Sequence, residues 1–206
     1  DDDYFEVNDL TLADDDVITG TGSYTYETWV KTTHTSLQTV LGTGGTGNGG
    51  TTLRLDASGR VEYNNTGFQA GTAEVVGTTP VNDGLWHHVA IVYDSTTGLA
   101  TVYVDGVAEA VGDAQSPNIT AGRLIVGEAN DHTANRDYNG DLANTRFWST
   151  ARTADEIAAH MNSVLKGDET GLATQYLYDE TIEGKFVDSA GSNDGTINGS
   201  VTVVDA

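Results

Sequence analysis

The chain has 206 residues, and its 31 Asp and Glu against 9 Lys and Arg give a formal net charge of -22. This balance excludes a nucleic-acid binder that works by neutralising phosphates and argues against a domain held on an anionic membrane surface. Cysteine is absent, which excludes disulfide scaffolds, Cys-ligated zinc and thiol catalysis. No run approaches the ~18 apolar residues of a membrane span, and the chain opens on three aspartates without a signal peptide. We therefore expect a module cut from a longer protein.

Short apolar runs recur along the chain between Gly and Asp, which is typical of a β-sandwich or barrel and not of βαβ units. The predicted strands cover residues 4–7, 24–31, 53–56, 60–63, 86–93, 100–104, 124–126, 146–148, 174–177 and 201–204. Asp105-Gly106 has the composition of a two-residue hairpin turn, and a wider turn at residues 94–98 precedes it. Residues 85–111 should therefore form a three-strand meander.

One helix is predicted near the end of this otherwise β chain. Thr153 and Glu156 have the spacing of a capping box, while Ile157, Met161 and Leu165 follow at helical intervals. Because a glycine at position 167 can end the helix, the expected range is 154–165.

These patterns together resemble the laminin-G-like and pentraxin-like domains of the concanavalin A superfamily. The specific part is LWHHVAIVYD at residues 85–94 followed by VYVDG at 102–106. Supporting matches lie at residues 24–31, 139–148, 153–157, 171–177 and 188–199. The resemblance implies an all-β fold, a jelly-roll sandwich of two antiparallel sheets, as one domain over residues 1–206. It does not imply one activity, because this fold hosts lectins, receptor-binding modules and glycosidases.

The richest polar segment is the predicted loop at residues 127–141. Ca²⁺ prefers six to eight oxygen ligands from carboxylates, amides and carbonyls, which this loop can supply. The candidate calcium ligands are Glu128, Asp131, Asp137, Asn139 and Asp141. Polar groups and a ring that could recognise a sugar are Asn130, His132, Arg136 and Tyr138. The alternative is a solvated acidic loop, and Ala143-Asn144 stands where the family pattern often has Asp-Glu, which weakens any cation site that depends on that Asp.

Other conspicuous residues favour structural roles. His87 and His88 cannot share a zinc ion, because adjacent strand residues point to opposite faces, so both should pack or form hydrogen bonds. The three tryptophans are interpreted as core anchors: Trp29, Trp86 and Trp148. The acidic groups Asp1–Asp3, Asp14–Asp16 and Asp188 with Asn193 and Asp194 are more typical of turns than of sites. The glycine-rich stretch at residues 42–50 lacks the Lys-Ser/Thr of a phosphate loop.

No motif in the chain predicts catalysis. The Glu-x-Asp-x-x-Glu run that glycosidases of this fold usually carry is missing, as is a Gly-x-Ser-x-Gly elbow. We therefore expect a monomeric, non-catalytic, calcium-dependent carbohydrate-binding module of a large adhesin on the surface of a bacterial or archaeal cell. Its partner would be a glycan or polysaccharide. Two alternatives stay open: a structural or protein-binding module of a surface protein, and a carbohydrate-binding domain attached to a polysaccharide-degrading enzyme. Adaptation to high salt is a rival explanation of the acidity.

Overall fold

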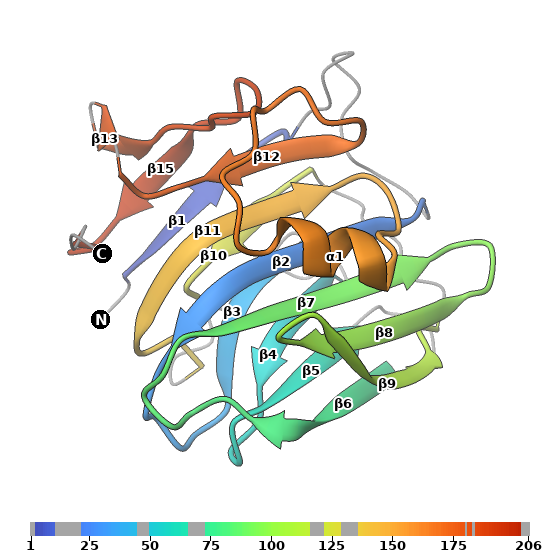
Figure 1. Cartoon of the computed structure of the whole chain (residues 1–206). Coiled ribbons are helices and arrows are strands. Elements are labelled where there is room, and N and C mark those ends of the chain that lie inside the picture. Colours follow the sequence, from blue (N-terminus) through green and yellow to red (C-terminus); the bar gives the residue numbers. More distant parts are fainter. Residues whose placement is uncertain are drawn as a thin grey trace.

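A computed structural model of the chain describes residues 3–10, 22–44, 50–65, 73–115, 122–128, 136–179, 181–182 and 184–202. Two antiparallel sheets stack face to face, with one short helix on the outside (Figure 1). The predicted jelly-roll sandwich is therefore confirmed. The nine-stranded sheet has the order β13-β14-β15-β1-β10-β3-β4-β5-β6, and the six-stranded sheet has the order β12-β11-β2-β7-β8-β9.

The nine-stranded sheet contains β1 (Tyr4–Val7), β3 (Gln38–Thr43), β4 (Thr51–Leu55), β5 (Arg60–Asn65), β6 (Ala73–Pro80), β10 (Leu124–Val126), β13 (Thr181–Ile182), β14 (Lys185–Phe186) and β15 (Gly195–Asn198). The six-stranded sheet contains β2 (Tyr24–Lys31), β7 (His87–Asp94), β8 (Leu99–Val104), β9 (Val107–Asp113), β11 (Asp141–Trp148) and β12 (Leu172–Tyr176). The helix α1 covers Ala154–His160.

The core lies between the sheets, where apolar side chains from both sheets face one another. In β2 the inward residues include Tyr24 and Tyr26, whose rings stack at 4.8 Å between centroids, with Phe147 at 5.1 Å from Tyr26. The Tyr26 hydroxyl lies 2.6 Å from Thr43 Oγ1 and 2.8 Å from Thr51 Oγ1, so its polar end is satisfied inside the core. The opposite face of β2 carries polar residues, and these residues form polar contacts beneath the helix and the segment that follows it.

The predicted strands are found with shifted ends, and several strands were not predicted. β3, β6 and β15 carry Gly and Thr in place of a clean apolar alternation, so they depend on pairing with neighbours already in the sheet. β11 begins five residues earlier than predicted and bends at a bulge around Asn144, whose φ is 52°. The strand predicted at 201–204 is not formed at residues 201–202, and its remainder lies outside the described residues.

The meander at residues 85–111 is confirmed as β7, β8 and β9. Both residues of the predicted hairpin turn have positive φ, 49° at Asp105 and 78° at Gly106. Such a turn matches the right-handed twist of the flanking strands. The Asp105 carboxylate also accepts a hydrogen bond from the backbone N–H of His88 at 2.9 Å, which fixes the end of the hairpin to β7.

The helix is shorter than the predicted range of 154–165. Its start is confirmed, because Thr153 and Glu156 form a complete capping box. Its end comes early because Arg146 donates to the carbonyl oxygens of His160 and Ser163, which turns the chain back onto the sheet. Leu165 then packs with Trp148 and Leu172 in a separate cluster that a continuing helix would not reach.

Candidate functional site

The base of the loop at residues 127–141 is tied to the start of β3. Gly127 donates its N–H to the carbonyl of Val40 at 2.8 Å, and its own carbonyl accepts from the N–H of Tyr138 at 2.8 Å. Thr39 donates its N–H to the carbonyl of Arg136 at 2.6 Å. Glu128 and Asp137 therefore flank the two ends of this loop, where the end of β10 meets the start of β3 inside the nine-stranded sheet.

Asp137 has the most informative side chain in this segment. Its Oδ1 atom is buried and has no hydrogen-bond partner, and the same holds for Nε2 of the buried Gln38 nearby in β3. Gln38 also accepts a hydrogen bond from the backbone N–H of Asn139 at 2.8 Å through Oε1. Buried carboxylate oxygens nearly always have a donor or a cation beside them, so the orphaned oxygen fits a cation ligand. Glu128, also buried, supplies a second carboxylate at the loop base.

The other predicted site residues are distributed more widely. The Asp141 carboxylate lies 3.5 Å from Lys31 Nζ, and Asn139 is exposed. The Tyr138 hydroxyl accepts from the N–H of Lys31 at 3.0 Å and donates to the carbonyl of Asp141 at 3.0 Å. Tyr138 thus closes the loop onto β2 and β11, with its ring against the core, and burial raises the pKa of its hydroxyl.

The predicted residues Asn130, Asp131 and His132 lie outside the described part of the chain. Within the described ranges, no three His, Asp or Glu side chains converge as a metal site. Of the alternating residues Asp137, Asn139 and Asp141, Asp141 pairs with Lys31. The calcium and sugar assignments to this loop stay predictions, for which the Asp137 carboxylate carries the structural argument.

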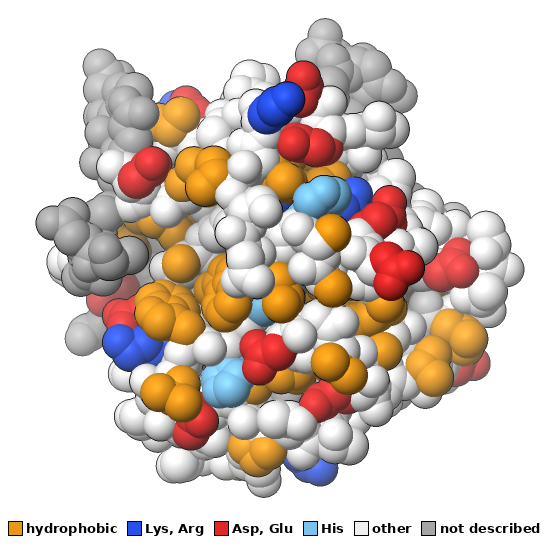
Figure 2. All heavy atoms as spheres, viewed as in Figure 1, with side chains coloured by type: hydrophobic (Ala, Val, Ile, Leu, Met, Phe, Trp, Pro, Cys, Tyr) orange, Lys and Arg blue, Asp and Glu red, His pale blue; other side chains and the backbone are white. Residues whose placement is uncertain are grey.

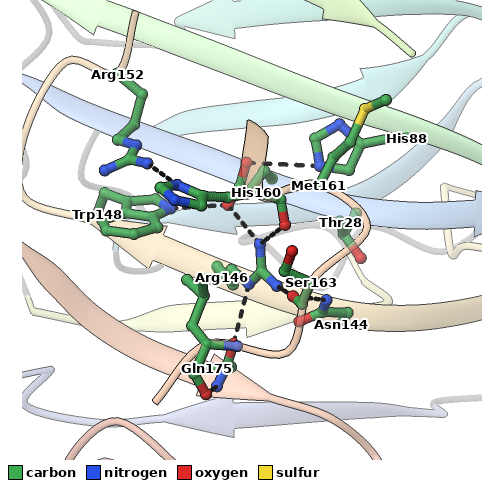
Figure 3. A network of polar contacts seen from close by, with 12 residues as sticks. Thr28, His88, Asn144, Arg146, Trp148, Arg152, His160, Met161, Ser163 and Gln175 are labelled. Atoms are coloured by element: carbon green, nitrogen blue, oxygen red, sulfur yellow. Dashed lines mark hydrogen bonds and ion pairs between the residues drawn. The ribbon is translucent and has the colours of Figure 1, made fainter. Parts of the chain in front are cut away.

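A second polar constellation lies under α1, on the outer face of the six-stranded sheet (Figure 3). Glu27 of β2 accepts hydrogen bonds from Arg146 Nη1 at 3.2 Å and from Trp148 Nε1 at 2.9 Å. Its second oxygen lies 3.5 Å from Nε2 of His88. Burial by itself would raise the pKa of Glu27, but His88, Arg146 and Trp148 outweigh it and lower that pKa to about 2.

This buried network holds the segment after α1 against the sheet. Arg146 also donates to Gln175 Oε1 at 3.1 Å, and Gln175 Nε2 donates to the carbonyl of Leu165 at 3.2 Å. The side chains of Glu27, His88 and Arg146 are 1–2% exposed. A carboxylate, an imidazole and a guanidinium therefore converge here where a polysaccharide cannot reach them. The sequence did not predict this network. The one indication was Glu27, a charged residue in the middle of the strand predicted at residues 24–31.

The histidine prediction is confirmed. The His87 imidazole lies 2.9 Å from Asp105 Oδ2 and 3.3 Å from Asp83 Oδ1, while the His88 ring enters the buried network on the other face. The three tryptophans differ in solvent exposure: Trp148 is fully buried, Trp29 is half-buried, and Trp86 is 39% exposed. The core-anchor interpretation is therefore wrong for Trp86, which precedes the first residue of β7 and remains exposed.

The turn interpretation of Asp188 is also confirmed. Its carboxylate accepts hydrogen bonds from the backbone N–H groups of Gln175 at 2.9 Å, Ala190 at 3.0 Å and Asn193 at 3.1 Å. Asp194 accepts from the N–H of Asp188 at 3.0 Å, so both side chains are used within the turn. Asp3 is exposed and accepts from the N–H of Ser200 at 2.5 Å. Residues 1–2, 14–16 and 45–49 lie outside the described ranges.

Comparison with known proteins supplies relatives for this architecture. Residues 2–158 match the concanavalin A-like lectin/glucanases superfamily. A rat protein, "Sushi, von Willebrand factor type A, EGF and pentraxin domain-containing protein 1", is 27% identical over 121 residues, which are 55% of this chain and 3% of that protein. The chain thus spans a small fraction of this curated relative.

Two solved structures share the fold. One, described as a "putative carbohydrate binding protein from Bacteroides ovatus", aligns with a TM-score of 0.76 and 26% identity over 100% of this chain and 59% of that one. The heptameric pentraxin of Limulus polyphemus aligns with a TM-score of 0.63 and 14% identity over 95% of this chain and 88% of that one. With the family match covering most of the sequence, the chain belongs to the concanavalin A-like lectin/glucanases superfamily.

Proposed function

We propose that this domain is a non-catalytic, calcium-dependent carbohydrate-binding module of a large extracellular adhesin. The observation that carries the carbohydrate part is the alignment of the whole chain with the Bacteroides ovatus protein, which is described as a "putative carbohydrate binding protein". The sealed Glu27–Arg146–His88 network supports the non-catalytic part, because glycoside hydrolysis needs two carboxylates that flank a bound sugar.

The calcium part rests on the loop at residues 127–141. The ion would be held by Glu128 and Asp137 at the base of the loop, with Asp131, Asn139 and Asp141 as further oxygen donors. The buried Asp137 oxygen without a donor supports this assignment. When bound, calcium would order the loop and present Asn130, His132 and Arg136 to a sugar. Location at the cell surface accords with the acidic, cysteine-free composition. Within the described residues, no helix is long and apolar enough to cross a bilayer.

The metal assignment predicts a calcium-dependent gain in thermal stability. A ligand at 100 times its Kd stabilises the native state by about 2.7 kcal/mol, which for a domain of this size raises Tm by roughly 5–10 °C. We expect this shift on adding millimolar CaCl₂ to EDTA-treated protein in 150 mM NaCl, measured by differential scanning fluorimetry.

Asp137→Asn should abolish most of the calcium shift, since it removes the charge that the ion would satisfy. The matched control is Asp168→Asn, an exposed acid elsewhere on the surface, which should keep the full shift. If wild-type protein melts at the same temperature in EDTA and in calcium, the calcium assignment is wrong.

The carbohydrate assignment is tested on an array of bacterial and plant polysaccharides, probed with and without calcium. Binding that requires calcium supports the whole proposal, and binding in EDTA supports carbohydrate recognition without the metal. No signal on any sugar would contradict the carbohydrate assignment. It would favour the second candidate, a protein-binding module. The likeness to a rat protein whose name lists sushi, von Willebrand factor type A, EGF and pentraxin domains supports this candidate.

A further inference from the structure

An exposed tryptophan lies at the start of β7, beside Lys31 at the end of β2. Trp86 directly precedes β7 and is 39% exposed, whereas Trp148, on the outer face of the six-stranded sheet, is fully buried under the segment after α1. More than a third of the surface of Trp86 is left in water, and covering this apolar area would be favourable. The ring is therefore available to a ligand.

A second indole lies beside it on the same face. Trp29 in β2 contacts His88 at 5.5 Å between ring centroids, and His88 is two residues after Trp86. The Trp29 indole donates to the carbonyl of Met161 at 2.8 Å, which holds its ring at the margin of the segment that follows α1. We name the surface formed by Trp29, Trp86 and Lys31 the tryptophan shelf.

Polar groups surround the tryptophan shelf at short range. Lys31 Nζ lies 5.7 Å from the centroid of the Trp86 ring and 3.5 Å from Asp141 Oδ2. The side chains of Lys31 and Asp141 are 42% and 44% exposed, so both can contact a ligand that covers the ring. Asp83 and Asp105 both contact His87, the residue that follows Trp86.

This arrangement complements the two sides of a sugar ring. A pyranose has one face of C–H groups, which stacks on an indole, and a circumference of hydroxyls, which pair with planar hydrogen-bonding groups. The core of a protein interface is depleted of charge, whereas here Lys31 and Asp141 lie directly beside the exposed ring. Figure 2 shows this face, where acidic, basic and histidine side chains are scattered among groups of apolar side chains.

The charges around the tryptophan shelf also select the class of sugar. Asp141 neutralises the only lysine of the shelf, and Asp83 and Asp105 add negative charge nearby. The whole chain carries a net charge of -22, which repels anionic polymers. A neutral hexose unit fits this potential, and a uronic or sialic acid does not.

We propose that the tryptophan shelf is a stacking subsite for a neutral hexopyranose of a polysaccharide, with Trp86 as its platform and Lys31 and Asp141 as its hydrogen-bonding rim. This rests on the proposed carbohydrate-binding function and adds the surface and the sugar class. The subsite lies at the Asp141 end of the loop at residues 127–141, so a polysaccharide chain could contact both.

The test compares Trp86→Ala with Leu99→Ala, because Leu99 is also 39% exposed but lies at the far end of β7 and β8. The probes are a neutral β-glucan, mannan and galactan, with polygalacturonate as the anionic polymer, in affinity electrophoresis and isothermal titration. We expect Trp86→Ala to weaken binding of the preferred neutral polymer by at least about tenfold, Trp86→Phe to restore part of it, and Leu99→Ala to leave it unchanged. The calcium shift of Tm should be the same in all three variants.

The outcomes separate this inference from the function on which it rests. If wild-type protein binds a neutral polysaccharide and Trp86→Ala binds it equally well, the shelf is not the subsite, while the carbohydrate-binding function stands. Preferential binding of polygalacturonate would overturn the neutral class. If wild-type protein binds none of these polymers and no sugar on the array, both proposals fail together.

Discussion

Glu27 shows how one residue joins the central sheet to the segment that covers it. Its carboxylate, on the outer face of β2, meets Arg146 and Trp148 of β11 and His88 of β7. A buried ion pair is costly to desolvate, and its worth depends on complete hydrogen bonding. Glu27 Oε1 accepts two hydrogen bonds. Arg146 in turn donates to the carbonyls of His160 and Ser163, so the ion pair stabilises the position of the segment after α1 on the sheet.

Glu27→Gln should therefore destabilise the domain strongly at neutral pH. The change leaves the Arg146 guanidinium buried without its counter-charge, which typically costs about 3–5 kcal/mol. Urea unfolding at pH 7, followed by tryptophan fluorescence, measures this loss. The control is Glu74→Gln, whose side chain is 55% exposed and should give a change below about 1 kcal/mol.

The same residue predicts an acid dependence. The folded pKa of Glu27 is about 2 against an ordinary value of 4.5, so its stabilising contribution is full above pH 4.5 and is lost as the pH falls toward 2. Between these values Glu27→Gln should lose less stability than wild type. Parallel curves for the two proteins between pH 5 and pH 2 would contradict the lowered pKa.

At the scale of elements, α1 is short and depends on its ends and on one apolar contact. Ile157 is its buried residue and packs against Ala90, Val92 and Tyr103 on the outer face of the six-stranded sheet. The N-terminus is held by the capping box of Thr153 and Glu156. Seven residues are too few for a helix to be stable by itself in water, so packing and caps together maintain it.

Thr153→Ala should lower the free energy of unfolding by about 1 kcal/mol, because it removes the acceptor for the N–H of Glu156 and breaks the capping box. Chemical denaturation of the purified domain measures the difference. Thr170→Ala, an exposed threonine outside the helix, is the matched control and should be close to neutral. An equal loss in both variants would show that the cap contributes nothing specific.

At the scale of the whole molecule, the acidity has two competing explanations. Some acids are used locally: Asp188 and Asp194 organise a turn, Asp105 closes a hairpin, and Asp56 pairs with Arg60. The remainder leaves a strongly negative surface whose self-repulsion opposes folding. Either monovalent salt screens this repulsion, or calcium binds and neutralises part of the negative charge.

These explanations predict different responses of Tm. A calcium module should reach its full stability with millimolar Ca²⁺ in 150 mM NaCl and change little on further NaCl. A protein adapted to high salt should instead gain stability progressively into molar NaCl, with no specific response to calcium. A titration of each salt, with MgCl₂ at equal ionic strength as control, distinguishes them.

The sequence by itself determined the local features of this protein. These features are the alternation in residues 24–31 and 86–93, the Asp105-Gly106 turn and the Thr153–Glu156 cap. Each depends only on residues that are close in sequence, so the sequence alone predicts it. The resemblance carried by LWHHVAIVYD and VYVDG extended this to the jelly-roll sandwich.

Only the tertiary structure decided which polar residues are enclosed and which are presented. Glu27, His88 and Arg146 are far apart in sequence and meet because β2 lies between β7 and β11, with the segment after α1 above them. The segment after α1 covers Trp148 and leaves Trp86 exposed, although both residues are tryptophan. Strand order and the path of a covering segment are long-range properties, and burial depends on them rather than on the residue type alone.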